Sequence, residues 1–162
     1  MSATQKLNFD DGLVRLAIND NGILVFNPTD FNVYERFFAL WKELPALEAK
    51  YAAEVETVPA GMETEQDMEL TGRELVIAKE IDAEIKAKLS SVFGARNDFD
   101  KLLGGVNIMA FGSNGERVIA NLLSALQPYI EDGVKTHTER AVSAAKLNRE
   151  QRRAAQRGRK KA

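Results

Sequence analysis

The sequence of 162 residues predicts an α+β fold that is mainly α, with an N-terminal β-hairpin packed on a bundle of about four to five helices. Two short apolar runs flank an Asn-Gly pair near the N-terminus, and such a pair is a strong short-range signal for a hairpin. Beyond residue 29, apolar side chains recur every three or four residues along several long segments, as they do on one helix face.

The length and composition fit one globular domain, with 44% apolar and 28% charged residues. We expect this domain to span residues 1–145, with a hairpin at 7–28 and helices over 29–145, followed by a basic tail at 146–162. The chain has no cysteine, which excludes disulfides and thiolate metal sites. It also lacks both the apolar run of a membrane span and the start of a signal peptide, so we expect a cytoplasmic protein with no membrane partner.

The net charge of −2 hides a strong asymmetry. Residues 146–162 carry eight basic side chains and one acidic one, whereas the remaining 145 residues carry 14 basic and 23 acidic ones. Such a tail can bind nucleic acid or an acidic protein surface. It can equally be a solvated helix end, or fold back on its own acidic body.

The hairpin is expected from residues 13–18 and 23–26, with Asp20-Asn21-Gly22 between them. Asn21 and Gly22 both tolerate positive φ, so we expect the tight turn there. A two-stranded hairpin is marginal in water, and it must pack on the helices or pair through its edge with another chain.

An aromatic helix is predicted from residue 31 to about residue 44, opened by a cap at Thr29 or Asp30 and ended or bent by Pro45 before helix resumes at 46–55. Its apolar face can belong to the core, or it can form a ridge or groove that accepts a partner helix. Six residues make up this face: Phe31, Tyr34, Phe37, Phe38, Trp41 and Leu44.

The residue pattern in the middle of the chain predicts an acidic loop followed by a central helix. Residues 57–70 contain a proline, a glycine and several acids, which favours a mobile, solvated loop rather than a cation site. Thr71 to Glu74 matches a capping box, and Gly94 is placed to end the helix that it opens. The core-facing stripe of this helix is Ala78, Ile81, Ile85, Leu89 and Val92.

The last third predicts a short capped turn at residues 97–100 and a further long helix. Ser113 to Glu116 matches a second capping box, and Pro128 is expected to kink or restart the helix that follows. His137 is expected at the surface, and the basic tail is expected to be disordered or frayed because it has almost no apolar face.

Four pieces of sequence stand in a distinctive order. Asn-Pro-Thr-Asp follows the hairpin and leads into Tyr-Glu-Arg-Phe-Phe at residues 27–38, and an acidic loop comes next. The central helix ends in Ser-Val-Phe-Gly at 91–94, and a second Phe-Gly stands at 111–112. The last helix contains Leu-Gln-Pro-Tyr-Ile at 126–130 before the basic tail. From about residue 7 to 155, this order resembles the tail assembly chaperones of long-tailed (siphovirus-type) bacteriophages and prophages of Gram-positive bacteria.

The resemblance implies a non-enzymatic assembly factor that binds the long, helical tape measure protein and keeps it soluble. It also implies recruitment of major tail tube subunits, in many members through a longer frameshifted product. Such a protein acts in the cytoplasm of the bacterial host and is absent from the mature virion, and it can be a homo-oligomer. Residues 98–106 depart from the family pattern, because this segment is longer and richer in glycine.

A second hypothesis is a small nucleic-acid-binding protein that uses the basic tail. An enzyme is the least favoured class, because the sequence shows no nucleophile–base pair, metal cluster or phosphate loop, and we expect no cofactor. The candidate protein-binding residues lie on the aromatic face and in the tail: Phe31, Phe38, Trp41, Arg149, Arg152 and Arg153.

Overall fold

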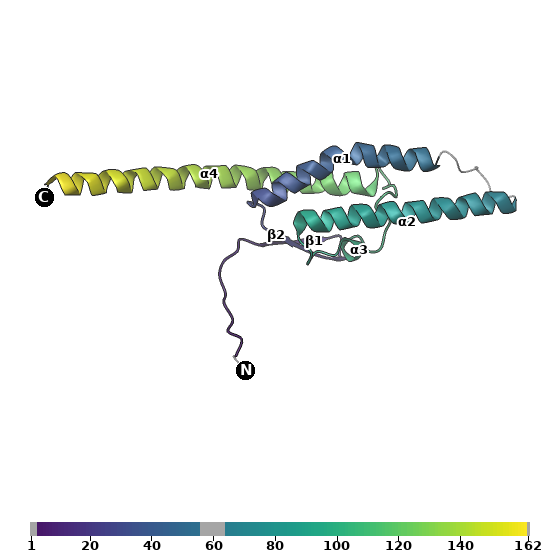
Figure 1. Cartoon of the computed structure of the whole chain (residues 1–162), viewed down its shortest axis with the longest axis horizontal. Coiled ribbons are helices and arrows are strands. Elements are labelled where there is room, and N and C mark those ends of the chain that lie inside the picture. Colours follow the sequence, from purple (N-terminus) through teal and green to yellow (C-terminus); the bar gives the residue numbers. More distant parts are fainter. Residues whose placement is uncertain (1–2, 56–63, 162) are drawn as a thin grey trace.

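The computed structural model describes residues 3–55 and 64–161 and confirms the α+β, mainly α fold. The elements are β1 (Val14–Ile18), β2 (Gly22–Phe26), α1 (Phe31–Val55), α2 (Glu65–Phe93), α3 (Phe99–Leu102) and α4 (Val118–Lys161). Figure 1 shows an elongated molecule in which the hairpin, α3 and parts of three long helices form the body. At one end α4 extends far beyond this body, and at the other end lies the start of α2.

The tight turn of the hairpin lies two residues earlier than the Asn-Gly pair predicts. Positive φ occurs at Asn19 and Asp20, with values of 44° and 63°, and Gly22 already pairs with Ile18. Asn and Asp are the non-glycine residues that best tolerate this conformation. Gly22 serves packing instead, because a Cβ there would stand 3.1 Å from the Leu102 side chain.

The outer edge of β2 is occupied by a single side chain, Asn97. Its Oδ1 accepts from the Val25 N–H at 2.9 Å, and its Nδ2 donates to the Val25 carbonyl at 2.9 Å. Nδ2 also donates to the Phe93 carbonyl at 2.9 Å, at the end of α2. The amide therefore replaces a neighbouring strand and ties the hairpin to α2, although the sequence predicted only a turn residue here.

One apolar core joins the hairpin to the three long helices. The expected stripe of α2 is confirmed, since Ile81, Ile85, Leu89 and Val92 are buried. The other elements contribute Leu24, Phe26, Val33, Phe37, Leu40, Phe99, Ile119, Leu123, Leu126 and Ile130. This packing fixes how the outward faces of the helices are oriented.

The start of α2 corrects the prediction of a loop up to residue 70 and of a cap at Thr71. The helix begins at Glu65, where Thr64 and Asp67 form a reciprocal capping box. Thr71 lies inside the helix and donates to the Asp67 carbonyl at 2.9 Å. The same hydroxyl-and-carboxylate signal occurs seven residues earlier, and the earlier copy is the one used. The rest of the predicted loop, residues 57–63, lies outside the described residues.

The start of α4 also differs from the prediction, because Ser113 to Glu116 forms a turn and α4 begins at Val118. Gly115 has a φ of 83°, which is incompatible with a helix, and the Gly112 N–H donates to the Glu116 carbonyl at 2.8 Å. The predicted capped turn at 97–100 is confirmed as α3, with Asp98 as its N-cap, and Gly94 caps the end of α2.

Neither internal proline ends its helix. α1 is continuous through Pro45 and α4 through Pro128. Figure 1 shows α1 as two straight parts that meet at an angle, which matches the bend expected of a proline. Leu126 and Ile130 are buried on either side of Pro128, and their packing holds that turn together despite the lost hydrogen bond.

The basic tail is helical, which corrects the expectation of a disordered or frayed segment. α4 continues to Lys161, although every side chain from residue 138 to 160 is exposed. Ala, Arg, Lys, Gln and Glu dominate this stretch and are strong helix formers. The packed part of α4 has already formed the costly first turn, so the helix propagates outward.

Replacing Asn97 tests its role as the clamp on the hairpin. Asn97→Ala is expected to lower the free energy of unfolding by about 3 kcal/mol, because Val25 and Phe93 would keep buried backbone groups without partners. Urea unfolding followed by circular dichroism measures the loss. Asn107→Ala is the control, because that half-buried amide also spans two segments but bonds to none of the hairpin. An equal or smaller loss for Asn97→Ala would contradict the clamp.

Candidate protein-binding surfaces

The aromatic face of α1 divides into a buried and an outer part. Phe37 is fully buried and lies 6.3 Å from Phe93 between ring centroids. Phe31 is 48% exposed, while Phe38 and Trp41 are half-buried against the core. Part of the face therefore packs in the core, and the rest stays partly exposed. We define this exposed part as the outer aromatic row, which consists of Phe31, Tyr34, Phe38 and Trp41.

One end of the outer aromatic row is joined to α4 through His137. The ring centroids of Phe31 and His137 are 3.9 Å apart, and His137 Nδ1 lies 3.0 Å from the Thr29 carbonyl. His137 is therefore half-buried and packed, which corrects the expectation of a surface residue. Gly133 permits the approach, because a Cβ there would stand 1.8 Å from the Pro28 carbonyl oxygen. A glycine within a helical pattern was the sequence signal for this contact.

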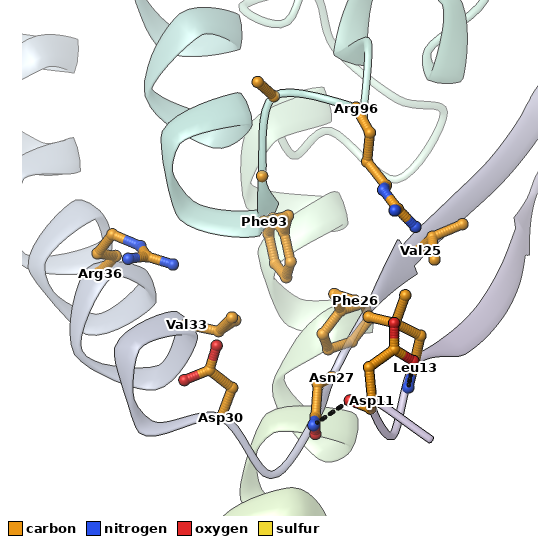
Figure 2. A pocket seen from close by; sticks show the side chains of 12 residues that line it. Asp11, Leu13, Val25, Phe26, Asn27, Asp30, Val33, Arg36, Phe93 and Arg96 are labelled. Atoms are coloured by element: carbon orange, nitrogen blue, oxygen red, sulfur yellow. Dashed lines mark hydrogen bonds between the residues drawn. The ribbon is translucent and has the colours of Figure 1, made fainter. Parts of the chain in front are cut away.

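A shallow pocket of about 430 Å³ lies where β2, α1 and the end of α2 meet. Phe26, Val33 and Phe93 are among the apolar residues that line it, and Figure 2 shows Arg36 and Arg96 approaching from opposite sides. The Arg36 guanidinium donates two hydrogen bonds to the Val92 carbonyl, at 3.2 and 3.3 Å, and so binds a backbone group at the end of α2. These arginines do not converge on one point, so the pocket offers no built anion site.

A larger groove of about 740 Å³ runs between β1 and the packed part of α4. Its apolar lining includes Leu16 and Ile18 from β1 and Leu122, Leu126 and Tyr129 from α4. β1 is paired only with β2, so the backbone groups on its other edge border this groove. An apolar groove beside an open strand edge can receive a peptide segment.

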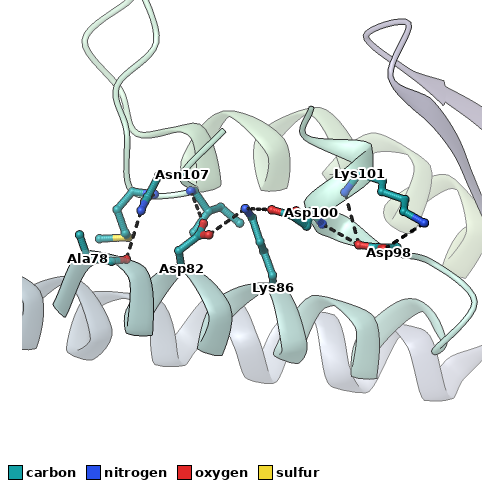
Figure 3. Close-up of polar contacts among 9 residues, drawn as sticks. Ala78, Asp82, Lys86, Asp98, Asp100, Lys101 and Asn107 are labelled. Atoms are coloured by element: carbon teal, nitrogen blue, oxygen red, sulfur yellow. Dashed lines mark hydrogen bonds and ion pairs between the residues drawn. The ribbon is translucent and has the colours of Figure 1, made fainter. Parts of the chain in front are cut away.

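The most buried charge in the described residues is structural. Lys86 is 7% exposed, and its Nζ lies 2.8 Å from Asp82 Oδ2 and 2.7 Å from Asp100 Oδ1 (Figure 3). Asp82 Oδ1 also accepts from the Ile108 N–H at 2.7 Å. Burial alone lowers the pKa of Lys86, but the hydrogen bonds to Asp100 and Asp82 and their negative charges raise it above its ordinary value. This cluster holds α3 and the segment before α4 against α2.

The basic candidates lie apart from the aromatic ones. Arg149, Arg152 and Arg153 are exposed on the projecting part of α4. Arg149 is twelve residues beyond His137, which is about 18 Å along a helix. The structure thus separates the two groups of candidate residues into different surfaces.

No match to this chain was found among protein-family models, curated proteins or solved structures. Within residues 3–55 and 64–161, no group of three or more His, Cys, Asp or Glu side chains is placed to hold a metal ion. No helix in the same described residues has the length and apolar character to cross a membrane.

The Lys86 cluster yields a stability prediction. Lys86→Met is expected to cost about 3 kcal/mol in the free energy of unfolding, because Asp82 is only 17% exposed and would lose its cation. Asp100→Asn is expected to cost less than about 1 kcal/mol, since the Asp100 side chain is 66% exposed. Urea unfolding at neutral pH compares the two variants, and equal losses would contradict the burial argument.

The same cluster predicts a pH dependence. The pKa of Lys86 is raised above 10.5 in the folded state, so its contribution is present below pH 10.5 and is lost as the pH rises through the raised pKa. Unfolding of the wild type at alkaline pH, compared with Lys86→Met, measures this loss. The stability difference between the two proteins should shrink above pH 10.5, and a constant difference would contradict the assignment.

Proposed function

We propose that this protein is a non-enzymatic phage tail assembly chaperone. In this proposal it binds the tape measure protein in the cytoplasm of the bacterial host, keeps it soluble, and helps to recruit major tail tube subunits. It is not retained in the mature virion. The order of short motifs between residues 7 and 155 is the reason for choosing this class of protein.

The outer aromatic row is the observation that carries the proposal. Phe31 is about half exposed, and Tyr34, Phe38 and Trp41 are partly exposed along one side of α1. A row of amphipathic rings on a rigid helix suits the apolar face of another helix. A long client with repeated amphipathic helices would engage several copies, which multiplies weak contacts.

The buried polar groups of the described core have structural roles. Asn97 and Lys86 are the buried polar or charged side chains of the described core, and both use their hydrogen bonds to hold segments together. Neither faces an activated nucleophile or a shared pocket, so we assign no reaction to them.

Co-expression with a fragment of the neighbouring tape measure gene product tests the proposal. The wild type is expected to move the fragment from the pellet into the soluble fraction. Phe31→Ala combined with Trp41→Ala is expected to lower that soluble yield several-fold, because it removes two rings of the outer aromatic row.

Phe9→Ala is the matched control, because its ring is 75% exposed and lies outside the outer aromatic row. Thermal unfolding of each variant separates lost binding from lost folding, since Trp41 also packs on the core. A soluble fragment with the double variant, or an insoluble fragment with the wild type, would contradict this function.

The nucleic-acid alternative is favoured by one observation, the fully exposed basic end of α4. Removing residues 147–162 is expected to leave the thermal unfolding midpoint nearly unchanged, because every side chain from 147 to 160 is exposed. If the chaperone proposal holds, the intact chain binds duplex DNA only weakly. Tight DNA binding that falls steeply with salt and vanishes on truncation would favour the alternative instead.

A further inference from the structure

Two stretches of helix in the described residues are only weakly packed, and Ile77 at the end of the first is partly buried against the core. No side chain from residue 64 to 80, at the start of α2, is buried, and every side chain from 138 to 160 in α4 is exposed. Helices of this length are marginal in water without a packed face. Each stretch would therefore gain stability from a surface to pack on.

The two stretches carry opposite charge. Residues 65–84 of α2 contain seven acidic and two basic side chains, whereas residues 138–161 of α4 contain nine basic and two acidic ones. Each stretch also exposes large apolar side chains, Met68, Leu75 and Val76 in α2 and Val142 and Leu147 in α4.

The basic charges of α4 gather mainly on one side of the helix, whereas the acidic charges of α2 lie on several sides. We define the acidic stripe as Glu65, Glu69 and Glu80, which share one side of α2 with exposed Val76. Glu69 in this stripe is also paired with Arg73 at 3.1 Å, on the exposed surface. The basic stripe recurs at spacings of three and four residues. It consists of Val142, Lys146, Arg149, Arg153, Arg157 and Lys160. Arg152 and Arg159 lie outside this stripe, roughly a third of a turn around α4.

Within one chain, the basic end of α4 cannot contact the acidic start of α2. Figure 1 shows the basic end of α4 and the acidic start of α2 at opposite ends of the longest axis. The projecting part of α4 is one continuous helix with a rise of about 35 Å, so it points away from its own α2.

We propose that the acidic stripe of α2 is the docking surface for the basic stripe of α4 in a second copy of this chain. The contact is head-to-tail, because the two surfaces differ, so repeated docking produces chains or rings rather than a closed two-fold dimer. Opposite charges along both helices fix the pairing and favour rapid association at low salt. This inference is independent of the proposed client.

Sedimentation velocity on the full chain tests the proposal. After nuclease treatment, the wild type is expected to form dimers and larger species at about 0.05 M NaCl and to dissociate at about 0.5 M. R149E/R153E is expected to weaken the association by about ten-fold or more, because it reverses two charges of the basic stripe. R152E/R159E makes the same change in net charge outside the basic stripe and is expected to weaken the association less than R149E/R153E does.

A mixing experiment tests the polarity of the contact. E69Q/E80Q removes two negative charges of the acidic stripe, so it should fail to associate alone, as R149E/R153E should. Mixed together, the two variants retain one intact contact, that of the basic stripe of E69Q/E80Q with the acidic stripe of R149E/R153E. The neutral glutamines offer no opposite charge to the reversed α4, so the mixture should form one-to-one pairs and nothing larger.

Several results would overturn the proposal. They are a wild type that stays monomeric at low salt, equal effects of the two arginine pairs, or a mixture that forms no pairs. Association that disappears on nuclease treatment would assign the basic stripe to nucleic acid instead. Circular dichroism confirms that each variant is folded, as expected for changes at exposed positions.

Discussion

The fork of hydrogen bonds between Asn97 and Val25 is the contact on which the arrangement of the body depends. A two-stranded sheet has two open edges, and this side chain occupies the outer edge of β2 while it also binds the end of α2. These hydrogen bonds hold the hairpin against the helices, and the residues that they join are 72 positions apart in the sequence. The outer edge of β1 has no paired strand in the described sheet, and it borders the apolar groove with α4.

The body fixed in this way determines which surfaces face outward. Packing of α1 through Phe37 presents the outer aromatic row, and the contact of His137 with Phe31 sets the point at which α4 leaves the body. Beyond that point nothing in the described chain covers α4. The proposed client surface on the body and the proposed assembly surface on the projecting helix are physically separate, so binding at one would not block the other.

Much of the fold followed from local patterns. The stripe around Ile85, the N-cap at Asp98 and the stop at Gly94 were predicted and are present. The errors arose where two local signals competed. Thr64 and Thr71 both fit a capping box, and Thr64 is the one that begins α2. Asn19 and Asp20 take the turn conformation, and Gly22 lies beside Leu102.

The sequence by itself determined the class of fold, the helical stripes and the separation of charge along the chain, because these depend on residue type and spacing. Only the tertiary structure decided that Asn97 clamps the hairpin, that His137 is packed, and that the aromatic and basic candidates lie apart. These contacts join residues far apart in the chain, so no local period encodes them. Only the tertiary structure, too, placed the acidic and basic helices at opposite ends of one molecule.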